Sequence, residues 1–319
     1  MSRSNEIFIG ELERAYIFHT SYNSLEERRV WIVRNKNRNV DNIKDKLPFR
    51  IERTFNDFSE VVASISKGDN IERIIFSLAD VPQKDIVKVF GNFEVIFPNY
   101  EKMMKKINKP VIAITTSTKG AGKSAVTLTY ATYFKNKNIP LIVATYPEFN
   151  GKFDSSITHS VIKTEEDIKN SPFVIESSEF KPYLSLNIPV YVGIDYTTLN
   201  NTKTEIVIWG ICKGSTEPPL IKPDVYITVV DLGREAWDYI SYPGIYNLRN
   251  SHIIFLNKAN IFKNSLKEQL IMQELKEINP NAEIIKVRQV EIGDDTSIVV
   301  PEDEKINIYE ILGCYIKGI

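Results

Sequence analysis

Cysteine and histidine are scarce in this chain, and their scarcity excludes several kinds of site. The 319 residues contain two cysteines, Cys212 and Cys314, and three histidines, His19, His159 and His252. Two cysteines make neither a disulfide framework nor a thiolate cluster for a metal. Three dispersed histidines give no zinc-binding spacing. The sequence also lacks an apolar run of membrane-spanning length and a signal peptide, so we expect a cytoplasmic protein that does not enter the membrane.

An excess of either charge is also missing. Lys and Arg number 40 against 41 for Asp and Glu, which gives a net charge of −1. Nucleic acid is therefore not an expected partner, because its binding usually relies on a basic field. The composition, 43% hydrophobic and 25% charged, is that of a globular protein long enough for two domains. A small anionic substrate is the expected partner, and a homodimer stays open.

The most informative segment is 111–124. The β-forming run 111–115 leads into a loop that ends in Gly120-Ala121-Gly122-Lys123-Ser124, and a helical segment follows. A strand, a glycine-bearing loop and a helix in this order are typical of P-loop nucleotide-binding proteins, although Ser117 stands where the pattern has glycine. A plain glycine turn with exposed Lys and Ser is the alternative interpretation.

This loop predicts a nucleotide site with ATP or GTP and Mg²⁺ as cofactors. Backbone amides of the loop and the start of the helix are expected to hold phosphate oxygens. Lys123 would reach the β- and γ-phosphates, and the Ser124 hydroxyl would bind Mg²⁺. The predicted phosphate-binding residues are Ser117, Thr118, Lys119, Gly120, Ala121, Gly122, Lys123 and Ser124.

Strand and helix patterns alternate along the chain, which predicts a largely parallel sheet with helices on both faces. Expected strands are 6–10, 29–33, 74–78, 93–97, 111–115, 140–144, 190–194, 205–209, 225–230, 253–256 and 284–287. Expected helices are 57–67, 83–90, 100–107, 123–135, 164–170 and 266–278. We predict an α/β fold in which a smaller Rossmann-like domain, 1–108, precedes a P-loop NTPase domain, 109–319, with a mostly parallel sheet and a hinge near Pro110.

Ligands of such sheets bind beyond the carboxyl ends of the strands. Asp195 and Asp231 each follow an expected strand, so we predict a catalytic role for Asp195 and a Mg²⁺-binding role for Asp231 beside Ser124. A helix N-cap or a turn is the alternative for both carboxylates. Strand 205–209 would be the usual source of a metal-binding Asp, but the next residue is Gly210.

Two further segments follow late strands. Asn257-Lys258-Ala259-Asn260 is close to a guanine-reading Asn-Lys-x-Asp motif, so Asn257 and Lys258 are predicted cofactor-binding residues. Asn260 lacks the carboxylate that would accept from guanine, which places guanine specificity in doubt. The segment 242–249 combines a Pro-Gly turn with Arg249, which we prefer to Arg234 as an anion-binding arginine.

Together these stretches resemble the archaeal P-loop proteins described as predicted GTPases or as cyclic 2,3-diphosphoglycerate synthetase-like proteins. The likeness is carried by 109–124, 192–196, 242–249 and 256–258, and in the first domain by 74–81. It implies a Rossmann-like domain before a P-loop domain and an ATP- or GTP-dependent ligase or phosphotransferase. It also implies a phosphorylated acid as substrate, with Lys123 and Mg²⁺ placing the γ-phosphate and Arg249 and Lys119 holding the substrate.

Two hypotheses on function follow. The first is an NTP-dependent enzyme, with ATP preferred to GTP, that acts on a small anionic phosphorylated substrate through Lys123, Asp195 and Arg249. The second is a nucleotide-binding regulatory or assembly protein with weakened catalysis, which Gly210 and Asn260 favour. An NAD-binding first domain is disfavoured, because Gly10-Glu11-Leu12-Glu13 is not a Gly-x-Gly-x-x-Gly loop.

Overall fold

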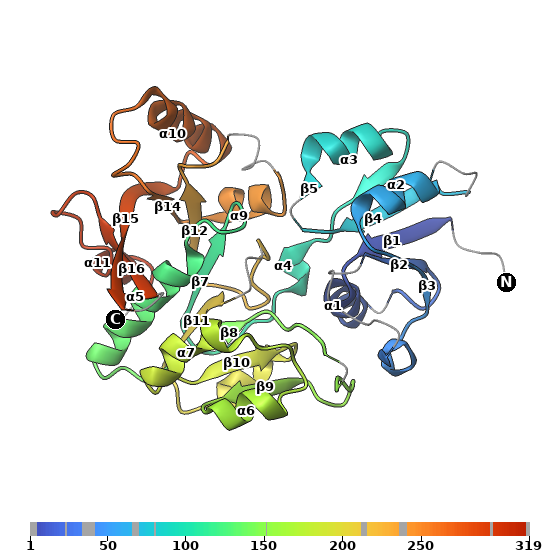
Figure 1. The fold of residues 1–319 in the computed structure, drawn as a ribbon, viewed down its shortest axis with the longest axis horizontal. Coiled ribbons are helices and arrows are strands. Elements are labelled where there is room, and N and C mark those ends of the chain that lie inside the picture. Colours follow the sequence, from blue (N-terminus) through green and yellow to red (C-terminus); the bar gives the residue numbers. More distant parts are fainter. Residues whose placement is uncertain are drawn as a thin grey trace.

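The computed structural model of the chain describes residues 5–22, 24–33, 42–65, 70–79, 81–150, 152–211, 216–235, 241–293 and 296–316. Its strands form two large sheets that lie side by side (Figure 1). The blue strands of the first sheet all precede residue 97, and the second sheet starts at residue 111. This division follows the predicted order of domains, while the boundary at residue 108 itself stays a prediction.

Within the described residues, the first sheet has five strands in the order β3-β2-β1-β4-β6, and every pair in it is parallel. Strand order reverses at β1, which is the arrangement of Rossmann-like sheets. The elements of this half are β1 (Glu6–Gly10), α1 (Leu12–Tyr22), β2 (Arg29–Val33), η2 (Lys44–Lys46), β3 (Ile51–Phe55), α2 (Phe58–Ile65), β4 (Arg73–Ser77), β5 (Val81–Pro82), α3 (Gln83–Phe90), β6 (Glu94–Ile96) and α4 (Tyr100–Met103).

The second sheet has nine strands among the residues described, in the order β16-β15-β14-β12-β7-β11-β8-β10-β9. Only the two outermost pairs, β16 with β15 and β9 with β10, are antiparallel. The elements are β7 (Val111–Thr116), α5 (Lys123–Asn136), β8 (Leu141–Thr145), β9 (His159–Ile162), α6 (Glu165–Asn170), α7 (Ser177–Ser185), β10 (Val190–Gly193), η3 (Tyr196–Asn201), β11 (Ile206–Ile211), β12 (Val225–Asp231), β13 (Ser241–Tyr242), α9 (Gly244–Asn250), β14 (Ile253–Asn257), α10 (Leu266–Ile278), β15 (Glu283–Gly293), β16 (Thr296–Pro301) and α11 (Glu310–Gly313).

Side-chain alternation along the strands supplies the layers on both faces of each sheet. In β1, Phe8 points to the face of α1 and packs on Phe18 with ring centroids 5.3 Å apart, whereas Ile7 and Ile9 join the cluster that contains Val61 of α2. Successive strand residues face opposite sides, so a strand apolar at every position needs cover on both. The fold is therefore the predicted α/β architecture, with a mostly parallel second sheet.

The two halves share their apolar cores. One cluster joins Tyr16 of α1 to Phe149 and Phe153 of the second half, with edge-on ring contacts at 5.3 and 5.4 Å. The short strands β5 and β13 pair antiparallel, with Tyr242 opposite Val81. These contacts hold the first sheet against the carboxyl side of the second.

Three local predictions need correction. The expected helix 100–107 ends at Met103, because Met104 is extended and Lys105 bridges to Ile221 instead. The expected strand 284–287 is the start of the longer β15, which turns back into β16. His159, at a position where no strand was expected, lies in the edge strand β9 and stacks on Tyr191 at 5.3 Å.

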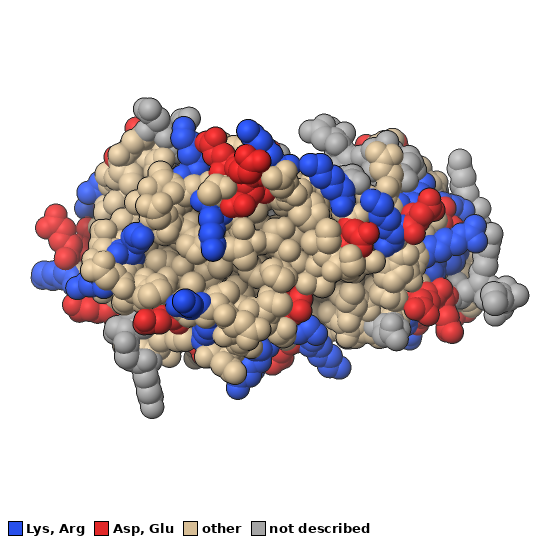
Figure 2. Space-filling model, turned by 90° about the horizontal axis from the view of Figure 1, so that it is seen from below, with Lys and Arg blue, Asp and Glu red and all other residues tan. Residues whose placement is uncertain are grey.

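The surface carries charges of both signs. Figure 2 shows Lys and Arg interspersed with Asp and Glu on one face of the molecule, around a largely uncharged centre. In the part of the chain that the structure describes, none of the helices combines the length and the apolar character that crossing a bilayer requires.

Candidate functional site

The loop between β7 and α5 has the backbone shape of a phosphate cradle. Gly120 and Gly122 have φ angles of 78° and 103°, in the left-handed region that glycine tolerates best. The backbone amides of Lys119 to Gly122 donate no hydrogen bond to any described residue. Within those same residues, the buried hydroxyls of Ser117 and Thr118 also have no hydrogen-bond partner. Donors arranged this way at a helix start suit an anion such as a polyphosphate.

Lys123 and Ser124 begin α5, at the inner side and the outer side of this loop respectively. Lys123 is 6% exposed, whereas Ser124 is open to solvent. A buried lysine at the first helical position and a hydroxyl beside it are the side chains that a P-loop uses for phosphate and Mg²⁺. The loop therefore fits a phosphate group, and the role of Ser124 as a metal ligand stays a prediction.

Asn257, predicted to read a base, instead supports the loop. Its side-chain Nδ2 donates to the Ala121 carbonyl at 2.9 Å, and its Oδ1 accepts from the backbone amide of Lys258 at 2.8 Å. A Cβ on Gly122 would lie 2.4 Å from Asn257 Nδ2 and 2.4 Å from Gln289 Nε2. Asn257 is fully buried, and its side-chain amide holds the loop from the end of β14.

Lys258 and Asp231 form an ion pair next to the loop. Lys258 Nζ lies 2.7 Å from Asp231 Oδ2, and Asp231 Oδ1 accepts from the amide of Gly233 at 2.7 Å. Both carboxylate oxygens of Asp231 thus have protein donors, and the residues described contain no group of three or more His, Cys, Asp or Glu side chains placed for a metal. A metal-binding role for Asp231 remains a prediction that this geometry does not favour.

Gly210 lies inside β11 rather than after it, and the structure leaves no room for a carboxylate there. A Cβ on Gly210 would lie 2.2 Å from Thr127 Oγ1 in α5. Thr127 uses the same hydroxyl to contact the carbonyls of Lys123, at 2.9 Å, and Gly210, at 3.2 Å. The close packing of α5 on β11 explains why this position is glycine.

The structure brings Arg234 rather than Arg249 to the loop. Arg234 Nη2 donates to the Lys119 carbonyl at 3.3 Å. The start of α9 contacts the loop, since a Cβ on Gly244 would lie 2.0 Å from the Ser117 carbonyl. Arg249 is exposed in the last turn of α9, and its own carbonyl accepts from Asn279 at 3.3 Å. The sequence preference for Arg249 therefore has no support in this placement.

Asp195 lies away from the loop. It follows β10, which is separated from β7 by β11 and β8, so about 14 Å of sheet intervenes at the usual ~4.8 Å strand spacing. Its carboxylate accepts from the amide of Thr197 at 3.1 Å and from the Thr197 hydroxyl at 2.5 Å. This is the helix-capping alternative considered for Asp195, and its predicted catalytic role remains a prediction.

A pocket of about 470 Å³ opens beside the loop. The loop and the first turn of α5 form one wall, and α7 and the β15–β16 hairpin form the others. Its lining residues are Thr116, Gly120, Ala121, Gly122, Lys123, Ser124, Ala125, Leu128, Ser178, Glu179, Pro182, Tyr183, Gln289, Thr296 and Ser297. The volume lies in the range of small-molecule sites.

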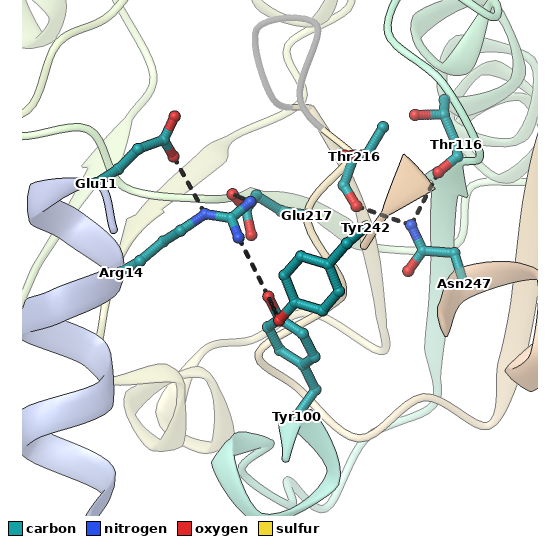
Figure 3. Close-up of polar contacts among 8 residues, drawn as sticks. All are labelled: Glu11, Arg14, Tyr100, Thr116, Thr216, Glu217, Tyr242 and Asn247. Carbon is teal, nitrogen blue, oxygen red and sulfur yellow. Dashed lines mark hydrogen bonds and ion pairs between the residues drawn. The ribbon is translucent and has the colours of Figure 1, made fainter. Parts of the chain in front are cut away.

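A buried polar cluster lies where the two sheets meet (Figure 3). Arg14 of α1, 2% exposed, pairs with Glu217 and with Glu11, whose Oε2 is 3.1 Å from Arg14 Nε. Arg14 Nη1 also donates to the Tyr100 hydroxyl at 3.2 Å, and Tyr242 donates to the same hydroxyl at 2.8 Å. The cluster joins residues that follow β1 to residues that follow β11.

Burial and charge fix the protonation of this cluster. Burial by itself disfavours the charged guanidinium, but the charges around it, Glu217 first and then Tyr100 and Glu11, together outweigh burial and hold the pKa of Arg14 well above its ordinary value. Burial raises the pKa of the Tyr100, Tyr146 and Tyr242 hydroxyls. These hydroxyls therefore stay protonated near neutral pH, and the Tyr242 hydroxyl donates to that of Tyr100.

Asn247 connects this cluster to the phosphate loop. Its Nδ2 donates to the carbonyls of Thr116 and Thr216, both at 2.8 Å, and its Oδ1 accepts from the Tyr226 hydroxyl at 2.7 Å. Thr116 precedes the loop and Thr216 precedes Glu217 (Figure 3). Sequence reasoning noticed Asn247 only within the segment 242–249. It missed Arg14, Glu217 and Gln289, since none of them carries a local motif.

Comparison with known proteins gives one distant likeness in sequence. No protein-family model matches the chain. The chain is 25% identical over 232 residues, 70% of its length, to a protein of Thermococcus kodakarensis named arginine synthetase ArcE. It spans about half, 51%, of that relative. The hydrogenase maturation factor HypB of Archaeoglobus fulgidus aligns over 56% of this chain and 80% of its own, with 15% identity and a TM-score of 0.27. The chain is thus a distant relative, in part of its length, of a protein named as a synthetase.

Proposed function

We propose that this chain is a nucleotide-dependent enzyme whose P-loop, residues 117–124, binds the phosphates of ATP or GTP with Mg²⁺. The shape of this loop carries the proposal: amides at Lys119 to Gly122 with no partner among the described residues, two left-handed glycines, and Lys123 and Ser124 at the start of α5. Preorganised donors of this kind stabilise the charge on a transferring phosphoryl group. Lys123 would neutralise that charge, and Ser124 would orient the metal.

ATP is the preferred nucleotide in this proposal. Guanine recognition needs an Asn with an available amide and a carboxylate three residues later. Here the Asn257 amide donates to the loop and Lys258 pairs with Asp231. The residue three positions after Asn257 is Asn260, which has no carboxylate. A site without the charged acceptor loses most of the discrimination in favour of guanine.

The second substrate in this proposal is a small molecule. Similarity to two different groups of proteins supports two different classes of compound. The name of the T. kodakarensis relative indicates chemistry that yields arginine, so an amino acid related to arginine is one class. The resemblance to cyclic 2,3-diphosphoglycerate synthetase-like proteins favours a phosphorylated acid. The carboxyl ends of both sheets meet at the Arg14–Glu217 cluster, and we propose that the substrate binds beside it.

Nucleotide binding is tested by thermal unfolding. Mg²⁺ with ATP at about 100 times its Kd should stabilise the fold by about 2.7 kcal/mol. The Lys123→Ala variant should lose the shift in Tm, whereas Lys135→Ala, an exposed lysine at the far end of α5, should keep it. Absence of a shift with both nucleotides would refute the proposal.

Catalysis is tested by phosphate release. The protein is incubated with MgATP and, in parallel, with arginine, citrulline or 2,3-diphosphoglycerate. Release that depends on one of these compounds identifies the class of substrate.

A nucleotide-binding regulator is the second candidate. Gly210 and the two protein donors to Asp231 favour it, because they remove the usual carboxylates from the metal. Tight binding of MgATP with no phosphate release over hours, whatever compound is added, would select this candidate.

A further inference from the structure

The pocket beside the P-loop continues past the positions where phosphates would lie. Its lining runs from Gly120 to Ser124 and then along α5 to Ala125 and Leu128. The nucleoside of a nucleotide bound to the loop must extend away from the loop. The pocket, about 470 Å³, is an open space next to the loop that could hold it. Pockets of 300–1,000 Å³ are the usual size for small ligands.

The walls of this pocket have the chemistry that a nucleoside needs. Ala125, Leu128 and the ring of Tyr183 give it apolar surface. The first turn of α7 places the Glu179 carboxylate on one side, and β15 places the Gln289 amide on the other. A carboxylate accepts from ribose hydroxyls or from base N–H groups, and an amide both donates and accepts.

Gln289 lies at the junction between loop and pocket. Its Nε2 is one of the two atoms that a Cβ on Gly122 would meet at 2.4 Å. Gln289 therefore lies beside the loop, where the pocket begins. Burial raises the pKa of the Tyr183 hydroxyl, and the charge of the nearby Glu179 raises it further.

The residues that would otherwise read the base are engaged elsewhere. Asn257 holds the Ala121 carbonyl and Lys258 holds Asp231. We propose that the nucleoside of the bound nucleotide lies in this pocket, and that Glu179 and Gln289 are the residues that hydrogen-bond to it. This inference rests on the proposed nucleotide-binding function, and it assigns nucleoside recognition to α7 and β15 in place of the Asn257–Lys258 segment.

Binding of three probes to the full chain tests the assignment: MgATP, MgGTP and inorganic tripolyphosphate with Mg²⁺. Tripolyphosphate has the phosphate chain without the nucleoside, so it reports on the loop alone. The variants are Glu179→Gln and Gln289→Leu. Glu176→Gln is the matched control, because Glu176 precedes α7 and does not line the pocket.

Loss of the negative charge from the hydrogen-bond acceptor is expected to weaken MgATP binding by about tenfold or more in Glu179→Gln. Gln289→Leu should weaken it less, because its amide is neutral. Tripolyphosphate should bind both variants and the control as it binds the native protein. The 2′-deoxy form of ATP, compared in the same way, shows whether Glu179 contacts the ribose or the base.

Two results would overturn the inference. Unchanged MgATP and MgGTP affinities in both variants would place the nucleoside elsewhere. An equal loss of tripolyphosphate binding would mean that the variants disturb the loop. Either result leaves the P-loop function intact, whereas failure of tripolyphosphate and both nucleotides to bind the native protein would refute the proposed function itself.

Discussion

Asn257 fixes the phosphate loop through one hydrogen bond, from its side-chain Nδ2 to the carbonyl of Ala121, 2.9 Å away. Because Asn257 is the last residue of β14 and fully buried, the loop is held by the strand two positions from its own in the sheet. A motif that looks like a base-reading segment in the sequence therefore acts on the shape of the loop.

Replacement of Asn257 by Asp should weaken nucleotide binding by about tenfold or more. The variant keeps the size of the side chain but removes the donor to Ala121 and adds a negative charge beside the phosphates. Isothermal titration with MgATP measures the effect. Asn250→Asp is the control, since the exposed Asn250 side chain donates within α9, to the Tyr246 carbonyl. Equal affinities for the two variants would contradict a loop-supporting role of Asn257.

The Lys258–Asp231 pair should act as one unit. We expect Lys258→Met and Asp231→Asn each to lower nucleotide affinity by a similar factor, and the double variant to lower it no further, because either change breaks the same contact. The Mg²⁺ concentration needed for binding should stay the same in all three. A rise in that concentration in Asp231→Asn alone would show that Asp231 serves the metal.

Gly210 should tolerate no side chain while Thr127 is present. Gly210→Ala places a Cβ 2.2 Å from Thr127 Oγ1, and overpacking of this kind costs about 1–3 kcal/mol of unfolding free energy. Urea unfolding measures this cost. The double variant Gly210→Ala with Thr127→Ala lacks the hydroxyl and methyl of Thr127, so it should regain part of the lost stability. If the double variant is no more stable than Gly210→Ala, the clash is not the reason for glycine at this position.

The Arg14–Glu217 pair should contribute strongly to holding the two halves. Arg14→Met leaves the 2%-exposed Glu217 carboxylate without this partner, and loss of one member of a buried pair costs about 3–5 kcal/mol. Arg14→Met with Glu217→Leu should be more stable than Arg14→Met alone, because the buried Glu217 charge is then removed together with its partner.

Lys267→Met is the control for that comparison. Its pair with Glu235 spans 3.9 Å at the surface, and such pairs contribute about 0–1 kcal/mol. A cost for Arg14→Met as small as the cost for Lys267→Met would show that solvent reaches the cluster.

The sequence by itself determined the elements whose signals are local. Apolar runs such as 111–115 and 225–230 are strands because a strand covered on both faces is apolar at every position. The loop at 117–122 follows from its glycines, and helix α6 begins at Glu165 because the capping box of Thr164 and Asp167 satisfies its first amides. Each of these depends on residues within one or two turns of one another.

The tertiary structure alone decided which partner each polar residue at the carboxyl end of a strand has. Asp231, Asp195 and Asn257 all follow or end strands of one sheet, yet they bind Lys258, Thr197 and Ala121 respectively. Pairings such as Arg14 with Glu217 join residues about two hundred positions apart in the chain, where no spacing rule applies. The packing of two sheets sets these distances, and a polar group takes whichever partner the packing leaves within reach, because burial without one is costly.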